Sequence, residues 1–516
     1  MIAVLTFDSA SVALLDTMIE SGRLPNLSSL AERGRRVELE TPARDFAAGA
    51  FYTLYSGIDI GDHGLFYPFQ WDARRQSVRQ AGELEAPPAI WERLAIAGRR
   101  TLAIDPYECR PPRRHQGTFV SGWGFEERTV LPAWSRPEVA RRALARDFGK
   151  PPRATEVFGR PRSSQLIALR SRLLDAPGRV ADAAVHLLSQ EQFDLAWLTF
   201  SAAHLAGHQF WDLSQLAEPW TNGDRRIVLE RTLTDVYGRV DEAIGRVLRA
   251  LPRDADVIVC SAVGMDVNTS RADLLPGMLA AVLSGGPLDE PSAVWRLRAA
   301  LPPGLRGAVA QALPRRLALE LTARLELSGV DRRGARAFAH PADNQGYIRF
   351  NLRGRERDGV VDPADAGALA EEIVAGLESF TDPDGRAAVA AIERTADRYA
   401  GEHAYRLPDL VVHWSERPAT TLELVRSDRF GAVRRQGAGS GRSGNHTPDG
   451  AWAIVAPGRS ALREPTRPPR LADVATSVAA ICGAPRDGLG GEPLLGPADR
   501  ADSAQPLILN LASRTE

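Results

Sequence analysis

The sequence predicts an α/β fold, in which a mostly parallel sheet lies between two layers of helices and a smaller subdomain is inserted into it. Short apolar runs that end in a polar or acidic residue recur along the 516 residues, with amphipathic helical stretches between them. This alternation is typical of parallel strands connected by helices that cover both faces of a sheet. The alternation stops between about 266 and 400, which indicates an insertion.

Five apolar stretches predict the strands of the sheet. The first, IAVLTFD at 2–8, is apolar almost to its end, as expected for a buried parallel strand that brings Asp8 to the carboxyl edge. The others are TLAID (101–105), DLAWLTF (194–200), DADVIVCSA (254–262) and AWAIVAPG (451–458), and SVALLDTMIESG (11–22) and LTDVYGRVDEAIGRVLRAL (233–251) predict helices. Ligands of open α/β sheets bind at the carboxyl edge, so the site is expected there.

The segment 266–400 has a different composition and predicts a cap. Its stretch 299–327 is rich in Ala, Leu and Arg and predicts helix. The stretch GYIRFNLRGRERDGVV (346–361) predicts two strands around a glycine-containing turn, and 363–380 predicts another helix. We therefore expect a core formed by 1–265 and 401–516, with 266–400 as the inserted subdomain.

Composition limits the classes of partner. Lys and Arg number 64 against 65 for Asp and Glu, so no overall charge attracts nucleic acid or an anionic membrane. The three cysteines, Cys109, Cys260 and Cys482, are too far apart for a CxxC metal site and too few for a disulfide framework. The chain begins without a basic leader and has no apolar run near about 18 residues. We expect a soluble, cytoplasmic protein that acts on a small molecule.

Three histidines are candidate metal ligands. His204 and His208 lie four residues apart in LTFSAAHLAGHQFWD (198–212), directly after a predicted strand. Residues at this spacing share one helical face, so both imidazoles can reach one ion. His446 lies in a glycine-rich loop, RRQGAGSGRSGNHTPDG (434–450), just before the last predicted strand. From the residues alone, a shared metal and ordinary structural histidines remain equally open.

A series of short motifs indicates the fold and function more specifically than the three histidines do, because the motifs follow one another in a characteristic order. The motifs are LTFD (5–8) with RLPNLSSLAERG (23–34), YTLYSGIDIGDHG (52–64), HLAGHQFW (204–211), SAVG (261–264), IRFNLRGRERDGVV (348–361), GEHAYRLPDLVV (401–412) and GNHTPDG (444–450). Together they resemble the alkaline phosphatase superfamily, and within it the bacterial proteins similar to type I phosphodiesterase/nucleotide pyrophosphatase. The resemblance implies an alkaline-phosphatase-like α/β/α sandwich and phosphoryl transfer with two metal ions about 4 Å apart and a Ser or Thr nucleophile.

The resemblance implies that the first ion site is altered. His208 and His446 match family ligands of this ion, and His204 stands where the family has Asp. Three imidazoles are a competent ligand set for zinc or another late divalent ion. We therefore expect one divalent ion, zinc, bound by His204, His208 and His446.

The resemblance also implies that the second site has lost most of its groups. Asp8 matches a ligand of the second ion, but Ala47 occupies the nucleophile position and Ala262 and Val263 occupy the two positions of the family's Asp-His pair. No second metal is expected. We expect Asp8 to be both a metal ligand and the catalytic residue, with three roles left open: a fourth ligand, a partner that orients an imidazole, or a general base.

Other polar residues are expected to be structural. Asp45 and Thr53 are each displaced from the nucleophile position, and we expect neither to replace it. The remaining candidates are His63, for which a structural role is expected, His340, His403 and His413, which have no convergent partners in the sequence, and Arg353, Arg355 and Arg357, which are expected in a solvated turn.

Two functions from different classes are compatible with these residues. The first is a divergent metal-dependent hydrolase or transferase that acts on a phosphoryl-like or other ester with a mononuclear three-histidine site. The alternative is a pseudoenzyme that keeps the fold and binds a ligand or partner without phosphoryl transfer. The metal content of the protein distinguishes them.

Overall fold

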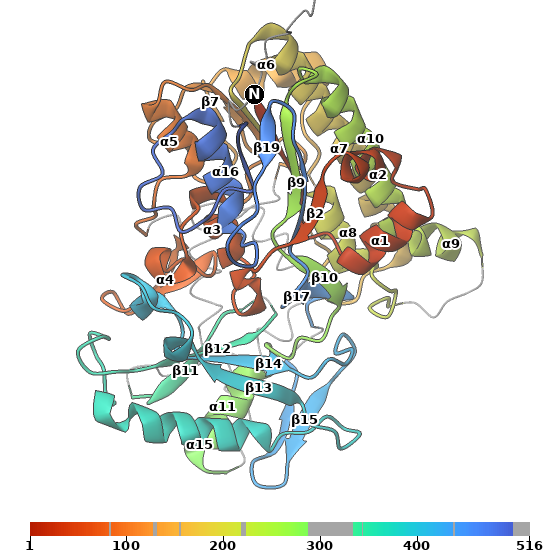
Figure 1. The fold of residues 1–516 in the computed structure, drawn as a ribbon. Coiled ribbons are helices and arrows are strands. Elements are labelled where there is room, and N and C mark those ends of the chain that lie inside the picture. The colour runs from red at the N-terminus through yellow and green to blue at the C-terminus, as the bar shows by residue number, and fades with distance from the viewer. Residues whose placement is uncertain are drawn as a thin grey trace, which may run out of the picture.

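The structure is a computed structural model that describes residues 1–81, 84–126, 132–153, 156–217, 223–286, 334–342, 344–436 and 439–498. A larger part contains the central sheet between two layers of helices, and a smaller part lies below it in Figure 1. The predicted helical stretch 299–327 lies outside the described residues.

The central sheet has eight strands in the order β2-β18-β9-β1-β8-β5-β6-β7. The middle strand β1 (Ile2–Phe7) pairs in parallel with β8 (Leu195–Phe200) and β9 (Asp256–Ser261). The remaining strands are β5 (Thr101–Ile104) and β6 (Gly117–Val120), which are also parallel, and β18 (Trp452–Ala456), β2 (Arg35–Glu38) and β7 (Ser135–Arg136), each antiparallel to its neighbour. The prediction of a mostly parallel sheet is confirmed.

Helices bury both faces of this sheet. Every residue of β1 is buried, and its side chains alternate between two apolar clusters, with Ala3 and Leu5 in one and Ile2 and Val4 in the other. The helices of the first cluster are α1 (Val12–Glu20), α2 (Pro25–Glu32), α6 (Ala140–Phe148), α7 (Ser163–Gln190), α8 (Ala202–Phe210), α9 (Asp224–Glu230) and α10 (Thr232–Ala250), and those of the second are α3 (Gly49–Ser56), α5 (Ile90–Ile96) and α16 (Ala472–Cys482). The result is a three-layer α/β/α sandwich (Figure 1).

The smaller part, which we call the cap, contains an antiparallel sheet in the order β11-β12-β14-β13. Its strands are β11 (Ala337–His340), β12 (Gly346–Phe350), β14 (Leu410–Trp414) and β13 (Val389–Arg394), packed with α11 (Leu275–Ser284), α15 (Ala366–Glu378) and the hairpin of β15 (Leu424–Ser427) and β16 (Gly431–Arg434). Since β14 and the hairpin follow residue 400, we propose that the cap extends to about residue 435. A strand such as PDLVV has the same apolar pattern in either sheet, so its sequence does not indicate which sheet it joins.

A small strand pair links the last part of the chain to the carboxyl edge of the central sheet. β10 (Gly264–Val267) follows β9 directly and pairs antiparallel with β17 (Gly444–Thr447), with Met265 opposite His446. Gly444 is required where β17 passes α8, because a Cβ there would lie 2.3 Å from the carbonyl oxygen of Gly207. This close approach brings the loop histidine next to helix α8.

A search of the described residues finds no helix that combines the length and the apolar character needed to cross a bilayer. The cysteines Cys109, Cys260 and Cys482 are all free thiols.

Candidate metal centre

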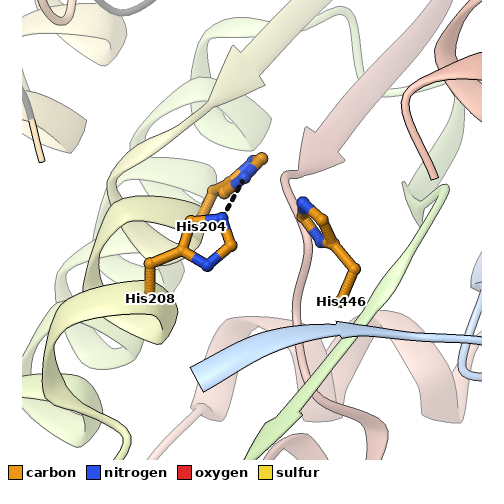
Figure 2. A group of neighbouring side chains, drawn as sticks. All are labelled: His204, His208 and His446. Atoms are coloured by element: carbon orange, nitrogen blue, oxygen red, sulfur yellow. Dashed lines mark hydrogen bonds between the residues drawn. The ribbon is translucent and has the colours of Figure 1, made fainter. Parts of the chain in front are cut away.

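Three imidazoles converge at the carboxyl edge of the central sheet. Helix α8 begins just after β8 and presents His204 and His208 on one face, and β17 supplies His446 from the opposite side (Figure 2). The ring centroids are 4.7 to 4.9 Å apart in all three pairs. One nitrogen from each residue lies within 4.8 Å of the others, and all three residues are buried. The chain thus brings together the three histidines expected from the sequence.

The outer nitrogens of two rings are already engaged. His208 Nδ1 lies 3.0 Å from the carbonyl oxygen of Gly444 and donates to it. His204 Nδ1 lies 3.1 Å from Asp8 Oδ1, and a carboxylate there requires the hydrogen on this nitrogen. Both Nε2 atoms therefore have lone pairs that face each other across 3.0 Å. Two lone pairs at this distance repel unless a proton or a metal ion lies between them.

Asp8 lies behind His204, and it is not among the groups that converge with the three histidines. It follows β1 directly, is completely buried, and accepts a hydrogen bond from the hydroxyl of Ser9 at 3.1 Å. A carboxylate that accepts from the outer nitrogen of an imidazole fixes the orientation of the ring and increases the basicity of its inner nitrogen. Of the three roles left open for Asp8, this geometry fits the orienting partner.

The environment also favours the uncharged form of His208. Burial first, and then the charge of Arg442 and the neighbouring imidazoles His204 and His446, hold the pKa of His208 well below 6.5. The neutral imidazole is the form that binds a metal ion. The donor set and its protonation therefore fit a divalent cation.

The three positions that the resemblance assigns to the nucleophile and to ligands of a second ion are apolar. Ala47, Ala262 and Val263 are at most 1% exposed and belong to the same apolar cluster as Ala50 and Ala451. None of these side chains has a lone pair to donate. Packed apolar side chains thus occupy the positions that the resemblance assigns to the partners of Asp8.

Thr53 is not poised as a substitute nucleophile. His63 Nδ1 accepts from the main-chain N–H of Leu65 at 3.0 Å, so the ring hydrogen is on Nε2, which lies 3.0 Å from Thr53 Oγ1. This tautomer donates to the hydroxyl and cannot take its proton. The geometry agrees with the structural role expected for His63.

His63 should make stability depend on pH. Burial first, and then His403 and Arg406, lower its pKa from 6.5 to about 3. Below pH 6.5 the unfolded chain binds a proton that the folded chain does not. The free energy of unfolding therefore decreases as the pH is lowered, by about 2 kcal/mol between pH 6.5 and pH 5. His63→Asn keeps an acceptor for Leu65 but cannot be charged, and urea unfolding of this variant should show a shallower loss between pH 7.5 and pH 5. His186→Asn is the control, and equal slopes for all three proteins would contradict the assignment.

A second group of side chains converges at the junction of core and cap. Asp45, Glu393 and His413 place possible ligand atoms within 4.8 Å of one another. Asp45 Oδ1 lies 3.1 Å from His413 Nε2, and Asp45 Oδ2 accepts from the Tyr399 hydroxyl. The sequence prediction that His413 has no convergent partner is wrong, because residues 368 positions apart in the chain meet only through the packing of the cap on the core.

This second group is already balanced by arginines. Arg44 and Arg398 both pair with Glu393, and Arg398 Nε lies 3.4 Å from Asp45 Oδ2. Burial by itself raises the pKa of Asp45, but the hydrogen bonds from His413 and Tyr399 and the charges of His413 and Arg398 outweigh it, and the net pKa is lowered. A divalent cation would meet two guanidinium groups at close range. We assign this group as an ion-pair network between core and cap.

The arginines of the turn after β12 have two different environments. Arg353 and Arg357 are exposed, as expected for a solvated turn. Arg355 differs, because it pairs with Asp409 at 2.6 Å and with the buried Glu356 at 3.1 Å. The prediction of solvation is therefore wrong for Arg355, whose partner lies 54 residues later.

A cleft of about 1390 Å³ runs along the junction and reaches the three-histidine site. His446 and Met265 line it from the strand pair β10 and β17, and Asn344, Arg398 and Tyr399 line it from the cap. Asn344 was not singled out in the sequence, where no periodicity or motif marks it. The cleft therefore reaches the candidate site at His446.

Comparisons with known proteins agree with this architecture. The family model described as Type I phosphodiesterase / nucleotide pyrophosphatase matches residues 2–424. Phosphonoacetate hydrolase from Sinorhizobium meliloti 1021, solved with phosphonoformate, is 15% identical with a TM-score of 0.51, and the match covers 93% of this chain and 95% of that chain. Murine ectonucleotide pyrophosphatase / phosphodiesterase 5 is 11% identical with a TM-score of 0.47, covering 95% and 97%. No curated protein matches.

The family model covers far more than half of the chain. Phosphonoacetate hydrolase is too distant in sequence to show more than the fold. The motifs LTFD, HLAGHQFW, SAVG and GNHTPDG lie at the carboxyl edge of the central sheet, whereas IRFNLRGRERDGVV and GEHAYRLPDLVV contribute strands to the cap sheet. The chain belongs to the type I phosphodiesterase/nucleotide pyrophosphatase family of the alkaline phosphatase superfamily.

Proposed function

We propose that this protein is a metal-dependent hydrolase or transferase that acts on a phosphoryl-like or other ester through a mononuclear site. His204, His208 and His446 would hold one divalent ion, zinc. The observation that supports this most directly is the geometry of His204 and His208. Their Nε2 atoms lie 3.0 Å apart, and both of their Nδ1 atoms already have hydrogen-bond partners. A proton or a metal ion between the two atoms would relieve their repulsion, and the third imidazole beside them favours a late divalent ion.

The protein residues then have separate tasks. A bound divalent ion would polarise the ester and lower the pKa of water. Asp8 holds the His204 ring through Nδ1, and Gly444 holds the His208 ring through its carbonyl oxygen. Ala47 excludes a covalent phosphoenzyme at the family's nucleophile position. The cleft beside His446 admits the substrate.

The proposed substrate is a small molecule. The related hydrolase was solved with phosphonoformate and with phosphonoacetate, which are small phosphonates. A near-zero net charge, with 64 basic and 65 acidic residues, supports neither nucleic acid nor a charged membrane as partner. From the sequence alone, we also propose a cytoplasmic location.

A pseudoenzyme that binds a ligand without phosphoryl transfer is the second candidate. It is favoured by the apolar packing of Ala47, Ala262 and Val263. Loss of the nucleophile together with most of the second ion site should lower ordinary phosphodiesterase activity by orders of magnitude, because these groups act as a unit.

Metal analysis of protein purified without a histidine tag should find about one equivalent of a divalent ion, since one three-histidine ligand set is present. The same sample should show little turnover of a nitrophenyl phosphodiester or a nucleotide pyrophosphate, and no phosphoenzyme. A metal-free sample that also fails to bind added Zn²⁺ would select the pseudoenzyme. Robust diester turnover with two equivalents of metal would show that the nucleophile or second site is elsewhere.

A further inference from the structure

The cap reaches the core through three donors near the start of β12. The side-chain amide of Asn344 donates to the carbonyl oxygen of His446, and the side-chain amide of Gln345 donates to that of Arg44. The hydroxyl of Tyr347 donates to the carbonyl oxygen of Asp45 at 2.8 Å. Two neighbouring cap residues thus make the same kind of contact, one to the strand of a metal-ligand candidate and one to the segment before Ala47.

Asn344 is held firmly within the cap. Its main-chain carbonyl oxygen accepts hydrogen bonds from the indole N–H of Trp414 at 2.9 Å and from the hydroxyl of Ser270 at 2.7 Å. The orientation of its amide is also determined, because a flipped side chain would place Oδ1 against the His446 carbonyl oxygen, and two acceptors repel. The hydrogen bond to His446 therefore transmits the position of the cap to β17.

Stability by itself does not account for an amide at this position. Asn344 is 6% exposed, and its Oδ1 has no hydrogen-bond donor among the described residues. An unpaired buried acceptor destabilises the folded state. What this side chain supplies in return is the contact to His446, next to the cleft that both residues line.

We propose that Asn344 is a positioning residue of the metal site, through which the docked cap holds His446 against His204 and His208. The inference rests on the proposed function, because it assumes that His446 is a ligand. Residues that orient a ligand from outside typically change metal affinity 10- to 100-fold when they are replaced. Cap docking and metal binding are then coupled through one hydrogen bond.

The test measures the affinity for Zn²⁺ by competition with a chromophoric chelator, in the full-length protein, together with the thermal midpoint. Asn344→Ala should lower zinc affinity about tenfold or more. Gln345→Ala is the matched control, because Gln345 is adjacent, is 2% exposed, also has an unpaired amide oxygen, and holds Arg44 instead of His446. Both variants should lower the thermal midpoint, but only the first should weaken zinc binding. Asn344→Ser removes the same amide and serves if the alanine variant does not fold.

The outcomes separate the inference from the proposed function. Equal zinc affinities for the wild type and Asn344→Ala would overturn the positioning role and leave the metal site intact. Equal weakening by Asn344→Ala and Gln345→Ala would overturn it as well, because general cap docking would then be responsible. A wild-type protein that binds no zinc would overturn both the inference and the proposed function.

Discussion

His204→Ala should lower the affinity for Zn²⁺ at least about 100-fold, which is the upper range for residues that only orient a ligand. The imidazole is one of three in the site, and its ring is fixed by Asp8 at 3.1 Å and faces His208 at 3.0 Å. Any metal-dependent activity should fall with it. Chelator competition gives the affinity, and elemental analysis gives the stoichiometry.

Two further variants make this result specific. His204→Asp introduces the residue that the resemblance gives for this position, so it should retain metal, but it should not restore phosphodiesterase activity while Ala47, Ala262 and Val263 remain. His413→Ala is the matched control from the ion-pair network, where three possible ligands also converge. If His413→Ala loses the metal and His204→Ala keeps it, the ion is bound at the junction with the cap and the three-histidine assignment is wrong.

The sequence predicted the parts of the fold that depend on local periodicity. The run at 2–8 is buried on both faces in the structure and does end at Asp8 on the carboxyl edge. His204 and His208 were expected to share a face because the helical repeat relates residues four apart. The family match over residues 2–424 spans every motif except the last, at 444–450. These features follow from a few neighbouring residues each.

The features that the sequence did not predict depend on contacts between distant segments. Asp45 and His413 meet because the cap sheet packs against the segment before Ala47. No local sequence pattern at either residue indicates the other as its partner. Asn344 reaches His446 across 102 residues. The strand β14 joined the cap instead of the core, although an apolar strand fits either sheet. Packing between distant segments determines each of these contacts, and the periodicity of a single sequence does not indicate such packing.

Asp45→Ala should destabilise the protein by about 3–5 kcal/mol, which is typical when one partner of a buried ion pair is removed. Asp45 is 1% exposed, and its carboxylate is contacted by His413, Tyr399 and Arg398 from the cap. Without it, these groups lose their anionic partner at the junction. Asp358→Ala is the control, since this carboxylate is partly exposed and pairs with its neighbour Arg357, so a change within about 0.5 kcal/mol is expected.

The pH dependence of the difference in unfolding free energy between wild type and Asp45→Ala tests whether the charged carboxylate is the stabilising form. Hydrogen bonds and positive charges lower the pKa of folded Asp45 below 3.8 despite burial. A carboxylate with a lowered folded pKa contributes stability that is fully present above the pKa of the unfolded chain and is lost as pH falls through the folded pKa. Urea unfolding followed by tryptophan fluorescence should therefore give a difference between wild type and Asp45→Ala that is at least as large at pH 5 as at pH 8. A difference that has already shrunk at pH 5 would mean that Asp45 is protonated there, and that His413, Tyr399 and Arg398 do not stabilise its charge.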